Sequence, residues 1–154
     1  MQLKAGQLAN MTTQKRLNIH AETLAAVEWW GSKPVEVTAE LVEAGLIRVY
    51  LATEAAPMIE ELKSELQNLL PQLRFDRAVV LADRYRSLTL AGNGQLALGQ
   101  EVIKFLGFSE HELPTLFVQP FPTGLEIMTL DHRSKRLART AEGTSIELRF
   151  RGME

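Results

Sequence analysis

Residues 88–108 read LTLAGNGQLALGQEVIKFLGF and contain the clearest structural signals in the chain. Two segments that alternate apolar and polar residues, 87–90 and 95–98, flank four turn residues. An Asn-Gly pair between such segments predicts a β-hairpin, because both central positions of its turn need positive φ, which Asn and Gly adopt readily. Residues 100–106 are typical of a short helix, which Gly107 would end. This stretch therefore predicts a strand, a tight turn, a second strand and a short helix.

The same signals outside this stretch predict further strands and helices. A helix is expected over 57–70, because its apolar residues recur at helical spacing and Pro57 suits a first helical position. Its apolar residues, which we expect to pack in the core, are Ile59, Leu62, Leu66 and Leu69. The remaining expected elements are strands at 17–19, 35–37, 46–51, 77–81, 116–119, 125–130 and 146–150, and a helix at 21–30.

A weak internal repeat appears when the chain is shifted by 79 residues, the separation between Leu17 and Leu96. Matching pairs include Glu22 with Glu101, Leu24 with Ile103, Val27 with Leu106, and Gly45-Leu46 with Gly124-Leu125. We predict two similar units, near 14–51 and 87–130, in a single compact unit of 1–154 with the helix 57–70 between them. One β-α-β-β unit alone buries too little surface to be stable, so the two would share a core.

Strand, turn, strand and a short helix ending in Leu106-Gly107 resemble the SpoVT/AbrB swapped-hairpin domain, and two copies in one chain resemble the MraZ subfamily. The resemblance implies an α+β, β-rich fold in which tandem β-α-β-β repeats pack as a barrel joined by an amphipathic helix. It also implies dimers or rings that bind DNA. The acid of the family's Asp-x-x-x-Arg motif is replaced by Thr12 and Ala91, and only Arg16 keeps the basic residue, since Gln95 stands at its second position. His20 and Gly99 replace the usual proline.

Composition limits the classes of function. The 154 residues include no cysteine, which excludes disulfides, thiolate metal sites and cysteine nucleophiles. With 45% hydrophobic and 23% charged residues the chain is expected to fold as a globular domain. No apolar run reaches the length of a membrane span, and residues 1–13 lack a signal peptide's apolar region, so a cytoplasmic protein without a membrane partner is expected. No cofactor is expected.

The net charge of −2 means that DNA would have to meet a local basic patch. The candidate contacts with DNA are Lys15, Arg16, Arg84, Arg86, Arg133, Lys135 and Arg136, with Arg139, Arg149 and Arg151 nearby. The alternative for each is an ordinary solvated surface residue. Trp30 is the candidate interface residue, because Trp29 and Trp30 can hardly both enter one core.

No nucleophile, base and oxyanion donor occur together, so we do not expect an enzyme, and the three scattered histidines do not predict a metal site. Asp131 and His132, read as strand neighbours, would point to opposite faces. The first hypothesis is an oligomeric DNA-binding transcriptional regulator. The second is a protein-interaction or assembly module on the same fold without DNA binding. The expected partners are therefore DNA, further copies of the chain, or another protein.

Overall fold

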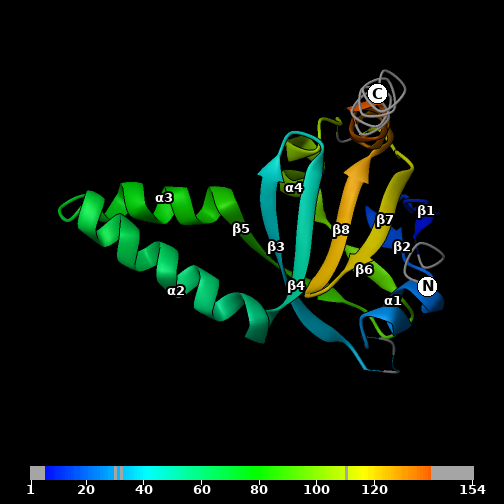
Figure 1. Ribbon diagram of the computed structural model, residues 1–154, viewed down its shortest axis with the longest axis horizontal. Helices are drawn as coiled ribbons and strands as arrows, with labels where there is room; N and C mark the ends of the chain where they lie inside the picture. The colour runs from blue at the N-terminus through cyan, green and yellow to red at the C-terminus, as the bar shows by residue number, and fades with distance from the viewer. Residues whose placement is uncertain (1–5, 30, 32, 110, 140–154) are drawn as a thin grey trace, which may run out of the picture.

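The computed structural model describes residues 6–29, 31, 33–109 and 111–139, which form a β-barrel with a long helical hairpin projecting from one side (Figure 1). The strands are β1 (Gln7–Ala9), β2 (Arg16–Asn18), β3 (Val35–Glu43), β4 (Leu46–Leu51), β5 (Tyr85–Leu90), β6 (Gln95–Ala97), β7 (Leu116–Phe121) and β8 (Gly124–Thr129). The helices are α1 (Ala21–Ala26), α2 (Ala52–Leu69), α3 (Arg74–Arg84) and α4 (Gly99–Phe105), and residues 130–139 are also helical.

All neighbouring strands are antiparallel, in the order β1-β7-β8-β4-β3-β5-β6-β2. A bridge between Met11 and Leu17 joins β1 to β2, so the sheet nearly closes on itself. This arrangement confirms the predicted mixture of helices and strands with a barrel-like sheet. The fold is not β-rich, however, because with the helical hairpin and the helix 130–139 at least as many described residues are helical as lie in strands. The strands around Gly45 and around residues 91–94 lie where the sequence predicts them.

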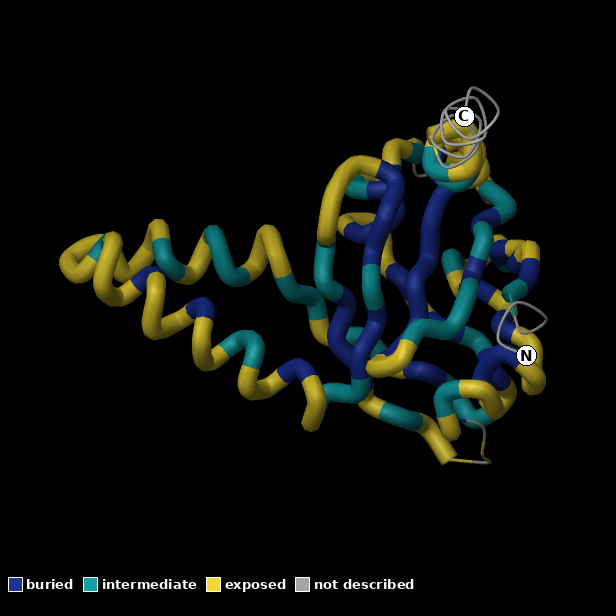
Figure 2. The backbone as a smooth tube through the Cα atoms, viewed as in Figure 1, coloured by how far each residue is buried: buried dark blue, intermediate teal, exposed yellow. Residues whose placement is uncertain are grey.

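The core lies inside the barrel and takes side chains from the whole length of the sheet (Figure 2). Leu17 on β2 lies directly opposite Leu96 on β6, and Ile47 on β4 lies opposite Ile127 on β8. All four side chains are at most 1% exposed. Each contributes roughly 1.5–3 kcal/mol by leaving water, so the barrel depends on contacts between distant parts of the chain.

The turns around Lys15 and Gly94, two positions 79 residues apart, have the same geometry. Lys15 has a φ of 64° and Gly94 a φ of 88°. In each turn a backbone amide donates to the carbonyl four residues later along the chain. The Thr12 amide donates to the Arg16 carbonyl, and the Ala91 amide donates to the Gln95 carbonyl. Two positive-φ positions were predicted for the hairpin at 91–94. The structure has one, at Gly94, because the turn spans four residues and closes with a single left-handed residue.

The two turns exchange hydrogen bonds with each other's strands. The amide of Ile19 donates to the carbonyl of Gly94 (2.9 Å), and the amide of Leu98 donates to the carbonyl of Lys15 (3.3 Å). The strand registers repeat as well. Gln7 pairs with Val118 in β1–β7, and their equivalents 79 residues away, Arg86 and Ala39, pair with each other in β3–β5. Both hairpins are therefore completed by the other half of the chain.

The short helices end alike. Glu28 after α1 and Gly107 after α4 both have positive φ, 63° and 102°. In both places the next amide bonds back to the helix, from Trp29 to Leu24 and from Phe108 to Ile103. This is a left-handed helix cap, for which glycine is the usual residue. The helix predicted over 21–30 is shorter because this cap ends it at Ala26.

The projecting hairpin of α2 and α3 corrects three sequence expectations. Helix α2 begins at Ala52, so Pro57 lies inside it rather than at its first position. Leu62 and Leu66 are buried as predicted, but Leu69 is 75% exposed because it lies near the hairpin tip. The strand expected over 77–81 is wrong, since these residues belong to α3, which packs on α2 instead of joining the sheet.

Candidate nucleic-acid interface

The seven basic residues predicted to contact DNA lie in three parts of the fold. Lys15 and Arg16 are in the turn before β2 and at its start, Arg84 and Arg86 are at the junction of α3 and β5, and the other three are on the helix 130–139. No described contact joins one group to another. Trp30 and the predicted strand 146–150 lie outside the described residues, as do Arg149 and Arg151.

The turn before β2 presents the most accessible pair. Arg16 is exposed, with its side chain on the outer face of β2, while Leu17 enters the core. Lys15 is half-buried, and its Nζ donates to the backbone carbonyl of Glu112 (3.0 Å). The related turn has Gly94 and Gln95 at the same two positions. Only one of the two turns in each chain is therefore basic.

The junction of α3 and β5 is different. Arg84 is exposed at the end of α3, but Arg86 is half-buried on β5 opposite Ala39. The Nε of Arg86 is buried and has no hydrogen-bond partner among the described residues. Arg86 is thus only partly accessible for a phosphate contact.

The three basic residues of the helix 130–139 are held by neighbouring side chains. The guanidinium of Arg133 lies 4.2 Å from the centroid of the Phe117 ring. Lys135 pairs with Asp131 one turn earlier (3.0 Å). Arg136 pairs with the carboxylate of Glu126 on β8 (3.2 Å). These contacts indicate that this group serves the protein's own surface more than it serves a polyanion.

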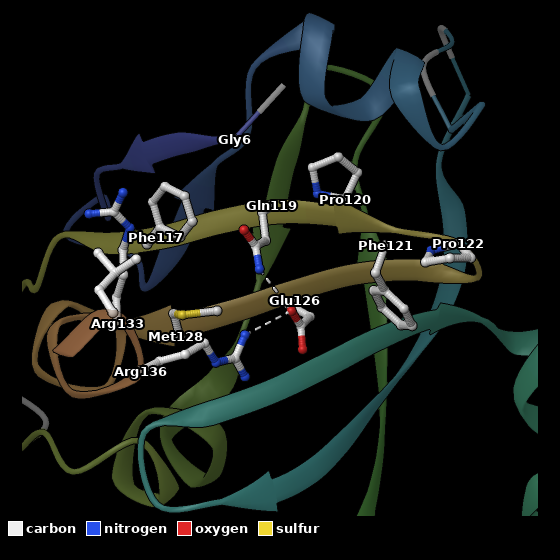
Figure 3. A pocket seen from close by; sticks show the side chains of 11 residues that line it. Gly6, Phe117, Gln119, Pro120, Phe121, Pro122, Glu126, Met128, Arg133 and Arg136 are labelled. Atoms are coloured by element: carbon white, nitrogen blue, oxygen red, sulfur yellow. Dashed lines mark hydrogen bonds and ion pairs between the residues drawn. The ribbon is translucent and has the colours of Figure 1, made fainter. Parts of the chain in front are cut away.

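Glu126 is the buried charge that the sequence reasoning missed. It is 7% exposed, and its carboxylate accepts hydrogen bonds from Gln119 (2.9 Å), Arg48 (3.1 Å) and Arg136 (3.2 Å), two of which Figure 3 shows. Burial alone would raise the pKa of Glu126, but these hydrogen bonds outweigh it and hold the pKa below its usual 4.5. The carboxylate is therefore ionised at neutral pH and fixes two arginines from different elements, one on β4 and one on the helix 130–139.

His132 was also misread, because it lies on a helix and not on a strand. Its ring is 8% exposed, and Nε2 lies 2.7 Å from a carboxylate oxygen of Glu43. This hydrogen bond lowers the pKa of the Glu43 carboxyl. The contact ties the helix 130–139 to the β3–β4 hairpin.

The helical hairpin carries the largest exposed apolar side chains. Helix α3 has no buried residue (Figure 2). Four apolar residues near the tip and along α3 are exposed, namely Leu69 (75%), Leu73 (49%), Phe75 (79%) and Val79 (41%). Apolar groups gathered on a projecting element are typical of a protein-binding surface.

The chain matches no protein-family model and none of the curated proteins. Among the described helices, none is long and apolar enough to cross a membrane. Within the same residues, no group of three or more His, Asp or Glu side chains could hold a metal ion.

Proposed function

We propose that this chain is an oligomeric DNA-binding regulator of the AbrB/MraZ-like type. The observation that supports this best is the reciprocal exchange of hydrogen bonds between the turns at residues 12–15 and 91–94. Two hairpins that complete each other in this way are what the resemblance to tandem swapped-hairpin proteins implies. The two halves would be copies of one unit, with β1 and β5 as their first strands.

The DNA contact would be made by Arg16 with Lys15. Arg16 is exposed and has no described side-chain partner, and exposed cations on a tight turn can reach phosphates without unfolding anything. Because the related turn holds Gly94 and Gln95, one chain offers a single basic turn. A second copy would supply the second turn, so DNA binding and self-association would depend on each other.

Self-association would use the helical hairpin. Phe75 and Val79 form an exposed apolar stripe on α3. The same two exposed side chains would face their copies across a twofold axis, which suits an isologous contact.

DNA binding is tested by fluorescence anisotropy of a short labelled duplex at several salt concentrations. Replacing Lys15 and Arg16 together by Gln should weaken binding and lower the salt slope by about 0.9 for each phosphate that the protein no longer neutralises. The matched control is Lys33→Gln with Lys63→Gln, which removes the same charge from two other exposed positions. Gln95→Arg should strengthen binding, since it makes the second turn basic. Equal effects of the two double variants would contradict the proposal.

A second candidate is an assembly module without DNA binding, favoured by the exposed apolar stripe on α3 and by the internal partners of Lys15, Lys135 and Arg136. Light scattering tests the assembly that both candidates require, and duplex binding separates them. Both expect a mass above the 17.3 kDa of one chain, reduced by Phe75→Ser with Val79→Ser but not by Leu113→Ser, another exposed apolar position. An assembly that binds no duplex at low salt leaves the second candidate.

A further inference from the structure

A hollow on the outer face of β7 and β8 carries chemistry that the proposed function does not use (Figure 3). It measures about 420 Å³. The two strands form its floor, the helix 130–139 forms one wall, and the turn between the strands closes the other end. Sites for small organic ligands typically have volumes of about 300–1,000 Å³, so this hollow is large enough for one.

Two of the four polar side chains that line the hollow are cationic. The four are Gln119, Glu126, Arg133 and Arg136. Glu126 lies in its floor, and Arg136 pairs with it from the helix. Arg48 pairs with the other carboxylate oxygen of Glu126 and lies over Phe121, with its guanidinium 5.8 Å from the ring centroid. Arg133 adds a second guanidinium to the lining, while Arg48 lies outside it. Since two guanidinium groups and one carboxylate line the hollow, it keeps a positive charge at neutral pH.

Arg133 is the cation that remains available. It contacts the ring of Phe117 but has no carboxylate or other hydrogen-bond partner among the residues that the structure describes. The face of the Phe117 ring holds the guanidinium in place. The N–H groups at the edge of the guanidinium stay available to other acceptors. An arginine arranged in this way binds a carboxylate or phosphate through two parallel hydrogen bonds.

The walls of the hollow are apolar. Phe117 and Phe121 stand at its two ends with Met128 between them (Figure 3), and Pro120 and the half-exposed Leu137 also line it. A fully hydrated inorganic ion would gain nothing from these side chains. A ligand with a flat apolar body would bury surface against them while its anionic group reached Arg133.

We propose that this hollow binds a small organic anion, in which a carboxylate or phosphate is attached to an aromatic ring system. Arg133 binds the anionic group, Phe117 beside it contacts the ring system, and Glu126 holds Arg136 in the lining. The site lies apart from the turn assigned to DNA and does not depend on the proposed function. It also explains why Arg133 and Arg136 are held in place and not spread in solvent.

Isothermal titration of the full chain at low salt tests the site with two anionic probes, adenosine monophosphate and benzoate. Their uncharged counterparts, adenosine and benzamide, are the ligand controls. At least one anion should bind saturably and at least about tenfold more tightly than its counterpart, because charge-assisted hydrogen bonds have this magnitude. Binding of the nucleotide alone identifies phosphate as the preferred group, and binding of benzoate alone identifies carboxylate.

The variant Arg133→Gln should weaken that binding about tenfold or more, and Phe117→Leu should weaken it with the charge unchanged. Lys135→Gln is the matched control, since Lys135 is on the same helix but pairs with Asp131 outside the hollow, and it should stay within about twofold of the parent. Thermal melting of each variant shows that it is folded. If neither anion binds saturably, if the uncharged counterparts bind equally well, or if Arg133→Gln and Lys135→Gln act alike, the proposal is wrong.

Discussion

The two halves of the barrel share several backbone features and differ in side-chain chemistry. Lys15 and Gly94 occupy equivalent left-handed positions, as do Glu28 and Gly107. Strand pairing repeats with the same register in β1–β7 and β3–β5. The buried charge does not repeat, since the position 79 residues before Glu126 is Ile47. The shared backbone features lie at turns, helix ends and strand pairs, while the buried carboxylate belongs to one half only.

The largest expected effect is on the core shared by both halves. Leu17→Ala and Leu96→Ala should each lower the free energy of unfolding by about 2–5 kcal/mol, because each leaves a cavity in a fully buried layer. The two losses should be similar in size, since the residues face each other at the centre of the β2–β6 pair. Urea denaturation measures both. A loss confined to one variant would show that the two halves do not contribute equally to one core.

The next effect concerns the charge present in one half only. Glu126→Gln should lower stability by about 1–3 kcal/mol at neutral pH, because Arg48 and Arg136 lose their buried carboxylate. Ile47→Val at the related position should cost only about 0.5–1.5 kcal/mol. If Glu126→Gln and Ile47→Val lowered the stability equally, the ion pairs of Glu126 would contribute no stability beyond that of ordinary packing.

The same carboxylate predicts how stability depends on pH. The folded pKa of Glu126 lies below 4.5, so its contribution is complete above the unfolded pKa and disappears as the pH falls through the folded value. Denaturation midpoints measured from pH 7 downward should therefore fall more steeply below about pH 4.5 in the parent than in Glu126→Gln. Parallel curves would contradict the assigned pKa.

The smallest effects are those at the two helix caps, and they should have opposite signs. Glu28→Gly should raise stability by about 0.5–1 kcal/mol, because it removes the strain of a side chain at positive φ. Gly107→Ala should lower it by about 1 kcal/mol for the same reason, since an added Cβ would meet nothing within 4 Å. Thermal melting detects both. Glu28→Gln keeps a side chain at this position and should change the stability little. If Glu28→Gln stabilised the protein as much as Glu28→Gly, backbone strain would not be the cause.

Sequence patterns predicted the parts of the fold that local turn chemistry determines. The hairpins around Gly45 and Gly94 follow from glycine at a left-handed position between alternating strands. The residues of α3 were misread because Val79 and Val80 are β-branched, and their neighbours gave no sign that the segment would pack on α2. Strand β1 was missed because its three residues are held by pairing with β7, more than one hundred positions away.

The candidate sites were less predictable than the fold. Glu126 lies between Leu125 and Ile127 in a strand whose six residues are all buried, and its partners come from distant elements. The one available signal was a single acid inside an apolar strand, which needs a cationic partner when buried. The basic run after residue 132 looked like one patch in sequence. On a helix its members face different neighbours, so Arg133 and Arg136 line the hollow and Lys135 does not.

The most direct test of the shared barrel uses disulfides, because the chain has no cysteine of its own. Asn18 and Gln95 face each other across the β2–β6 pair, within the separation that a disulfide needs. The double variant Asn18→Cys with Gln95→Cys should oxidise to a disulfide within a single chain, seen as a faster non-reduced band. Asn18→Cys with Ala97→Cys, displaced along the strand, should not. Failure of the first pair to close, or closure only between two chains, would contradict a barrel in which the halves of one chain complete each other.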